Sequence, residues 1–148
     1  VLWTSLWLGL ASDAVGRARA FVRAAARRTP GTAPPSALRL AEMVADLSTM
    51  RATVHQGLAD FEAAQNDPDT LSSLGFAIRM NNLKASASTM APAIVGRALG
   101  VCGISGYRCD SPYSVGRHLR DAHGAALMIS NDRVLSANAA MLLVHKED

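Results

Sequence analysis

Two glycines and the short run around them are the first residues of this chain whose types and spacing could support chemistry. Gly103 and Gly106 stand in the run GISGY. A glycine adopts a positive φ at no steric cost and lets bare backbone come close to a ligand or another chain. The same property lets a glycine end a helix. A helix-ending turn is the simpler interpretation, and a ligand contact stays open from these residues alone.

Thiols and imidazoles, the other reactive side chains, form no recognisable site. Cys102 and Cys109 flank the glycine run and could form a disulfide, but an intracellular pair of free thiols is the favoured state. With no CxxC or HxxxH pattern nearby, no metal site is expected. The four histidines form no catalytic triad, and His118, near Asp121 in sequence, is interpreted as a surface ion-pair partner. We therefore assign no catalytic residue from these side chains.

A charged amphipathic segment follows the glycine run, after Ser111 and Pro112. Arg117 lies about one helical turn from both Arg120 and Asp121 on one face. The apolar residues of the other face recur at helical spacing, and they are Val115, Leu119, Ala122 and Ala126. The segment therefore predicts a short amphipathic helix that carries ion pairs.

Long helices must position this stretch, because apolar residues recur at steps of three and four along the preceding chain. The first helix is predicted from near the start to about residue 28, where the run TPG ends it. The second is predicted over about residues 37–65, with Ser36 as its cap. The third follows Asp67, expected as an N-cap, and Pro68, expected at the first helical position.

Two further features complete the predicted helices. Pro92 should bend the third helix or leave a gap in its hydrogen bonds. A last helix is predicted from Arg133 to about Val144, with caps supplied by residues 130–132, and residues 145–148 form a charged tail.

Size and composition set the fold class. The chain has 148 residues, of which 49% are hydrophobic and 5% aromatic, so residues 1–148 are expected to form one domain around one core. Alanine and leucine are abundant and β-branched runs are nearly absent, which favours helices packed on helices. Because the connections are short, we predict an all-α fold, an antiparallel up-and-down four-helix bundle with a short terminal helix.

Charge and hydropathy argue against two classes of partner. The formal net charge is +3, and the arginines are spread over several faces without interleaved aromatic residues, so nucleic acid is not expected. Asp13 and Arg17 interrupt the first apolar pattern too early for a membrane span, and no signal peptide is recognisable. We expect a soluble, cytoplasmic protein. Because it starts inside a helical pattern, the chain looks like a piece of a longer one.

The glycine run and the amphipathic segment together carry a resemblance. GISGY, followed after a loop by Val115, Arg117 and the run LRDA, resembles the C-terminal α-helical domain of the acyl-CoA dehydrogenase family. The run from Asn82 to Cys102 is similar to the helix that leads into the turn in that family, and the resemblance covers most of the chain. It implies an oxidoreductase of fatty acid metabolism that needs an N-terminal helical domain and a middle β-domain, neither encoded here, to hold FAD and an acyl thioester.

The resemblance also implies how this domain is used. Members of the family associate through it, so a homo-oligomer, dimer or tetramer, is expected. The glycine turn contributes backbone contacts to FAD held mainly by a neighbouring subunit, and Gly103 and Gly106 carry that role here. Gly100 and Ile104 stand where the family's pattern has a glutamine and another glycine. The chain alone is expected to bind no FAD.

An arginine at the end of the first helix contacts the FAD phosphates of the partner subunit in the family. Counting back from the turn that follows this helix gives that role to Arg27 or Arg28, whereas counting along the helix gives the position to Ala25. For the two arginines, the alternative is a solvated basic face.

A catalytic base is the feature that the resemblance does not locate. Most of the family removes the proton α to the thioester carbonyl with a glutamate nine residues beyond the arginine of RDA, and counting from Arg120 reaches Ile129. An isoleucine cannot take a proton, so the base is missing, moved, or located before Val1, as in some relatives. Ser130 and Asn131 replace a glycine and a threonine of that segment. Their backbone N–H groups could face a phosphate or the flavin, or the two residues could cap the last helix.

Three functional hypotheses follow. The first is FAD-dependent α,β-desaturation of an acyl thioester by the parent protein. The second keeps the fold but makes the parent a flavin monooxygenase, which needs no α-proton base and fits Ile129. The third is a non-catalytic helical module that serves oligomerisation.

Overall fold

The computed structural model describes residues 1–146, so Glu147 and Asp148 of the predicted tail lie outside the described residues. Its helices are α1 (Leu2–Arg28), α2 (Ser36–Ala64), α3 (Pro68–Ser72), α4 (Leu74–Cys102), α5 (Ile104–Tyr107), α6 (Gly116–Leu127) and α7 (Asn131–Leu142). Residues 1–146 contain no strand, and the helices pack against one another. The predicted all-α fold is confirmed.

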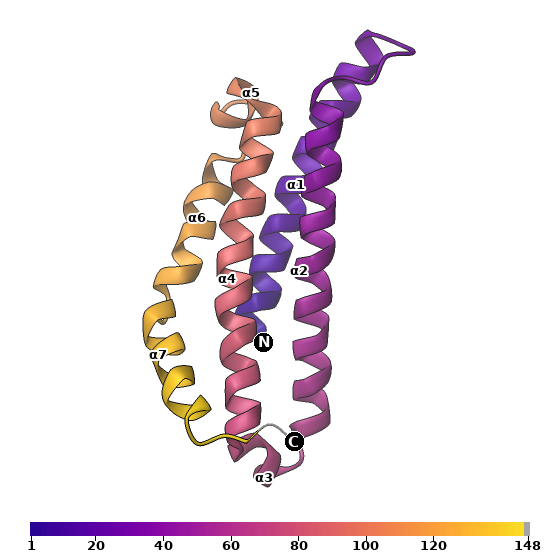
Figure 1. Ribbon diagram of the computed structural model, residues 1–148. Helices are drawn as coiled ribbons and strands as arrows, with labels where there is room; N and C mark the ends of the chain where they lie inside the picture. The colour runs from indigo at the N-terminus through magenta and orange to yellow at the C-terminus, as the bar shows by residue number, and fades with distance from the viewer. Residues whose placement is uncertain (147–148) are drawn as a thin grey trace.

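The helices form an up-and-down bundle, as predicted (Figure 1). α2 runs antiparallel to α1, α3 turns the chain at the lower end, and α4 returns beside α2 to α5 at the upper end. α6 and α7 then descend one after the other along α4, so the terminal helix extends the fourth column of the bundle. α4 contacts α1, α2, α6 and α7 and therefore holds the columns together.

The hydrophobic core lies along the seam of the three long helices. Its buried side chains recur at steps of three and four, and they include Trp7, Ala11, Val15, Ala18 and Val22 of α1, Met43, Leu47, Met50 and Val54 of α2, and Leu83, Ala87, Ile94 and Ala98 of α4. Trp7 is 4% exposed, whereas Trp3 lies off this stripe and is 51% exposed. The predicted apolar pattern of α1 therefore covers both a core face and an outer face at its start.

The helix starts differ from the prediction in two places. Asp67 is an N-cap, and its carboxylate accepts hydrogen bonds from the backbone N–H groups of Asp69 and Thr70, but the helix that it caps is the five-residue α3. Ser73 provides a second cap, accepting from the N–H of Phe76, and there α4 begins. Two caps that lie close together in the sequence thus separate a short helix from the long one.

Ser36 was predicted as the cap of the second helix, and that assignment is wrong. Ser36 is the first residue of α2, the N-cap is Pro35, and no side-chain hydrogen bond closes this end. Pro35 already has helical φ and ψ angles, which leaves Ser36 inside the helix. α4 continues through Pro92 from Leu74 to Cys102, so the proline does not end it.

Three features of the described residues bear on membranes, disulfides and metals. No helix of the described residues is long and apolar enough to cross a bilayer. Cys102 is buried and Cys109 exposed, and both are free. Within residues 1–146, no group of three or more His, Cys, Asp or Glu side chains could hold a metal ion.

The turn at the end of α4 generates a stability prediction. A Cβ at Gly106 would lie 2.7 Å from the Cβ of Cys102, whereas one at Gly16 would meet nothing within 4 Å. We expect Gly106→Ala to lower the free energy of unfolding by about 1–3 kcal/mol because the added methyl overpacks the turn. Gly16→Ala, the matched control within α1, should raise it by up to about 1 kcal/mol. Urea unfolding followed by circular dichroism measures both, and a Gly106→Ala protein as stable as the wild type would contradict the packing described.

Candidate functional site

The two predicted glycines have different surroundings. Gly103 ends α4 with a φ of 55°, donates its N–H to the carbonyl of Leu99 at 2.8 Å, is exposed, and has open space where a Cβ would be. Gly106 is buried, and its carbonyl accepts a hydrogen bond from the N–H of Val115 at 2.8 Å, which folds the chain back onto α6. The surface at Gly103 is therefore exposed and has room for a ligand, although its carbonyl accepts from the N–H groups of Gly106 and Tyr107 and its N–H is also bonded. Gly106 packs inside the turn.

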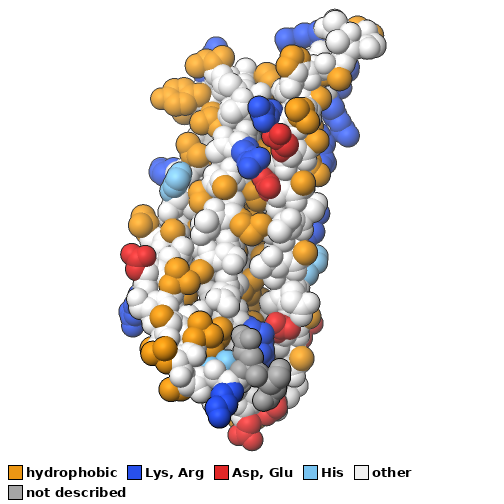
Figure 2. All heavy atoms as spheres, viewed as in Figure 1, with side chains coloured by type: hydrophobic (Ala, Val, Ile, Leu, Met, Phe, Trp, Pro, Cys, Tyr) orange, Lys and Arg blue, Asp and Glu red, His pale blue; other side chains and the backbone are white. Residues whose placement is uncertain are grey.

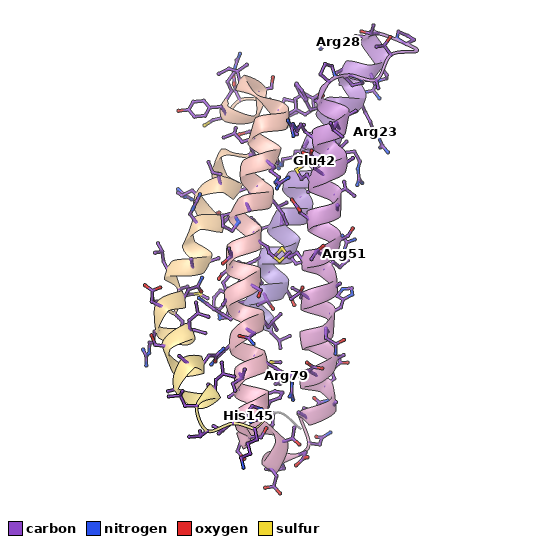
Figure 3. All side chains as sticks on the ribbon, viewed as in Figure 1. Arg23, Arg28, Glu42, Arg51, Arg79 and His145 are labelled. Atoms are coloured by element: carbon purple, nitrogen blue, oxygen red, sulfur yellow. The ribbon has the colours of Figure 1, made fainter. Side chains whose placement is uncertain are left out.

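Arg27 and Arg28 lie in the last turn of α1, at the same upper end of the bundle as Gly103 and α5. Both side chains are exposed, and neither has an acidic partner within 4 Å among the described residues. Figure 3 shows Arg28 at the tip of α1, next to the connection that leads into α2. This end of the molecule therefore presents positive charge and the exposed glycine turn.

The connection between α6 and α7, residues 128–130, includes Ile129, the position at which the sequence led us to expect the family's base segment. Lys84 of α4 donates to the backbone carbonyl of Ile129 at 2.5 Å and to the side-chain oxygen of Asn131 at 2.6 Å. The buried hydroxyl of Ser88 donates to the same oxygen at 3.0 Å. Burial lowers the pKa of Lys84. This set of hydrogen bonds ties the connection, hereafter the corner, to α4.

The hydrogen bonds decide the roles of the predicted residues at the corner. The side-chain oxygen of Asn131 is engaged by Lys84 and Ser88, so Asn131 anchors the start of α7. Ser130 is the N-cap of α7 but makes no side-chain cap hydrogen bond, and α7 begins at Asn131, two residues before the predicted start. The backbone N–H groups of this first turn are therefore not closed by a side-chain cap.

Ile129 is the strained residue of the corner. Its φ is 54°, a conformation that L-residues with a branched Cβ rarely adopt, and its side chain is 61% exposed. The hydrogen bond from Lys84 to its carbonyl holds that conformation. Strain in an exposed residue held by its surroundings is a mark of a functional position. Ile129 offers neither an acidic nor a basic group, so what it presents is an apolar surface.

Along the seam between α1 and α6, a polar cluster fixes how the two helices align. Asp13 accepts a hydrogen bond from Arg17 at 2.8 Å and lies 2.6 Å from Nε2 of His118, while Arg17 donates to the carbonyl of Ser114 at 2.9 Å. The hydrogen bond from Arg17 holds the pKa of Asp13 below its usual value, and His118 adds to that effect. His118 was expected to pair with Asp121, and the structure pairs it with Asp13 of α1.

The ion pairs of α6 also differ from the prediction. Asp121 pairs with the adjacent Arg120 at 3.2 Å, and no pair joins Arg117 to Asp121 within the described residues. His118 Nδ1 is buried without a hydrogen-bond partner there. An ion pair between α6 and α1, from His118 to Asp13, thus takes the place of the pairs within α6 that the residue spacing predicted.

The seam places the exposed start of α1 level with the corner. α1 and α6 are antiparallel, and Asp13 pairs with His118. The residue ten positions before Asp13 is therefore level with the residue ten positions after His118, so Trp3 is level with Met128. Trp3, Leu6 and Ile129 are 51%, 57% and 61% exposed. Figure 2 shows further hydrophobic side chains gathered over α6 and α7. Leu127 of α6 and Leu135 of α7 are both exposed. We call Trp3, Leu6 and Ile129, three exposed apolar side chains at the start of α1 and at the corner, the apolar wall.

An apolar groove adjoins the start of α1. It has a volume of about 530 Å³ and lies between α1, α2 and α4, and its lining includes Leu2, Leu58, Phe61, Phe76 and Met80. The sequence predicted each of these helices but not the groove that forms where they pack together.

Lys84 was also not predicted from the sequence as a site residue, although it is one of only two lysines in the chain and interrupts an apolar run of α4.

The strain at Ile129 can be measured with two substitutions that remove the same side chain. We expect Ile129→Gly to be more stable than Ile129→Ala by about 1 kcal/mol, because only glycine adopts the positive φ of this position without a steric cost. Thermal or urea unfolding of the two variants gives the difference. An alanine variant of equal or greater stability would mean that the corner is not strained at this residue.

Comparison with known proteins places the chain in a family. The family model described as "Acyl-CoA dehydrogenase, C-terminal domain" matches residues 2–137, from the start of α1 into α7. No curated protein and no solved structure matches the chain. The match includes the glycine turn, the amphipathic helix and the corner in the order that the resemblance required. The chain therefore belongs to the acyl-CoA dehydrogenase family, in which it corresponds to the C-terminal helical domain.

Proposed function

We propose that residues 1–148 form the C-terminal domain of an FAD-dependent flavoprotein that introduces an α,β double bond into an acyl thioester. The observation that carries the proposal is the family match over residues 2–137. The apolar wall, exposed and held in place by Lys84 and by the seam, supports a role beside a flat ring and an acyl chain. The other domains of the parent complete the site.

The residues at the upper end fit the phosphate part of FAD. Arg27 and Arg28 supply charge without a competing carboxylate, and Gly103 leaves room for a phosphate to approach the turn closely. Arginine forks bind phosphates in proteins, and a glycine without a Cβ lets a ligand come close. We propose that they contact FAD held mainly by a neighbouring subunit, which requires a homo-oligomer formed through this domain. FAD, when bound, supplies the hydride acceptor.

At the corner, the chain presents an apolar side chain that excludes water once substrate and the other domains cover it, and it leaves proton transfer to another residue. Removal of the α-proton needs a carboxylate aimed at that carbon, and Ile129 occupies the corner with an apolar side chain. A dry surface strengthens every electrostatic interaction made by a base that reaches the same carbon from elsewhere. We propose that a group outside this domain provides the base in the desaturation reaction.

A second function is favoured by the same residue. A flavin monooxygenase of this fold needs no α-proton base, and Ile129 within an apolar wall fits a substrate that is held but not deprotonated. The two functions differ in how the flavin becomes reduced.

For either function, the free thiols at Cys102 and Cys109 fit a protein of the reducing cytoplasm.

The purified 148-residue chain should be colourless. Its helices offer contacts for phosphates and one wall, but no β-domain on which the ring of FAD can rest, so we expect no flavin absorbance after incubation with FAD and gel filtration. Intrinsic tryptophan fluorescence and circular dichroism serve as controls for folding. A folded chain that elutes from the column with bound flavin, and is therefore yellow, would contradict the division of the site between domains.

Substrate reduction of the parent protein separates the two functions. If the full-length flavoprotein is a dehydrogenase, anaerobic mixing with acyl-CoA should reduce its flavin, and the absorbance of the oxidised flavin should disappear in a single-turnover experiment. Ile129→Ala should change the reduction rate by less than about tenfold, because an isoleucine takes no proton and only packing is lost. Absence of reduction by acyl-CoA, with reduction by NADH or NADPH instead, would contradict the desaturation and favour the monooxygenase.

A further inference from the structure

A cavity distinct from the apolar wall lies where the α5–α6 loop meets α1 and α6. Its volume is about 300 Å³, and it is lined by Arg17, Cys109, Ser111, Ser114, Arg117 and His118. The lining combines two guanidinium groups, an imidazole and two hydroxyls, and it includes no carboxylate. Such a lining repels cations and offers hydrogen-bond donors to an anion. Neither the family's cofactor contacts nor the corner uses these side chains.

Arg17 is held in position before any ligand arrives. Its Nε donates to Asp13 and one terminal nitrogen donates to the carbonyl of Ser114, which uses two of the five N–H donors of a guanidinium. The remaining donors belong to a group whose orientation is already fixed from two sides. A fixed donor loses less freedom on binding than a mobile one does.

Arg117 and the start of α6 supply the unpaired donors. Arg117 has no acidic partner within 4 Å among the described residues, because Asp121 pairs with Arg120 and Asp13 pairs with Arg17 and His118. The first helical hydrogen bond of α6 is from Leu119 to Val115, and no side chain caps this helix. The preceding N–H groups of α6 are therefore free at the end that borders the cavity, and this end of a helix favours negative charge.

We propose that this cavity binds a phosphoryl oxyanion, either free phosphate or the phosphate group of a small phosphomonoester. A cavity of about 300 Å³ is at the lower end of the range for ligand sites and exceeds the space of a few waters, so it admits a phosphate with room for a substituent. Arg17 and Arg117 bind the oxygens, and the hydroxyls of Ser111 and Ser114 complete the contacts. Its Arg17 lies about 15 Å along α1 from Arg27, so the cavity and the arginines at the end of α1 are different groups of residues.

Titration followed by ¹H–¹⁵N NMR tests the proposal on the 148-residue chain. Sodium phosphate, added at constant ionic strength with chloride as the exchanged anion, should shift the amide signals of Gly116, Arg117 and His118 along a saturable curve in the millimolar range or below. Arg117→Gln should weaken binding at least about threefold, because it removes one charged donor from an exposed contact. Arg51→Gln, on the outer side of α2 in Figure 3, is the matched control and should leave the curve unchanged.

A second titration with AMP separates the two sources of the oxyanion. Tighter saturation by AMP at the same amides assigns the site to a phosphomonoester, and equal or weaker saturation assigns it to free phosphate. Shifts that stay linear with both ligands, or an Arg117→Gln protein with unchanged affinity, would overturn the proposal.

Cys109 gives a readout that does not depend on NMR. It lines the cavity and is exposed, whereas Cys102 is buried, so a thiol reagent in the folded chain reports on the rim of the cavity alone. Phosphate should slow modification of Cys109 by a negatively charged disulfide reagent, and Arg117→Gln should remove that protection. Equal slowing in both proteins would count against a bound oxyanion.

Discussion

The packing of α4 against the helices of the other columns, α1, α2, α6 and α7, is the constraint on which the rest of this structure depends. Its residues hold two of the candidate features in place: Lys84 and Ser88 fix the corner, and Leu99 accepts the N–H of Gly103 at the exposed turn. Asn81 and Asn82 of α4 also bind the buried Asn138 of α7, each at 2.8 Å. Because buried amides without these partners would cost free energy, the position of α7 along α4 is fixed.

This arrangement divides the candidate contacts between two places. Positive charge and the exposed glycine turn lie at the upper end, where α1 stops and α5 begins, whereas the apolar wall lies lower, where α1 starts and the corner turns. A long cofactor with a phosphate part and a ring could meet such a surface at separate points. Under the proposed desaturation, the isoleucine at position 129 leaves the proton transfer to another group.

Local patterns in the sequence predicted the helices well, since the apolar steps and the TPG and Asp67–Pro68 breaks are determined by neighbouring residues. These local patterns did not predict contacts between residues that lie far apart in the sequence. His118 bonds to Asp13, 105 positions away, and Lys84 reaches Asn131 across 47 positions, so neither contact leaves a periodic signal. The division between Gly103 and Gly106 was equally hidden, because it depends on how Val115 folds back onto the turn. The cofactor roles of the predicted residues stay predictions.

A crystal structure of the full-length parent with FAD tests the central claim most directly. We predict that the ring lies beside the wall formed by Trp3, Leu6 and Ile129. Arg27 or Arg28 should lie within hydrogen-bond distance of the phosphates of FAD from a neighbouring subunit, with Gly103 in van der Waals contact with them. No proton acceptor from residues 128–131 should face the substrate carbon. FAD bound away from both surfaces, with the wall covered by another domain, would contradict the account.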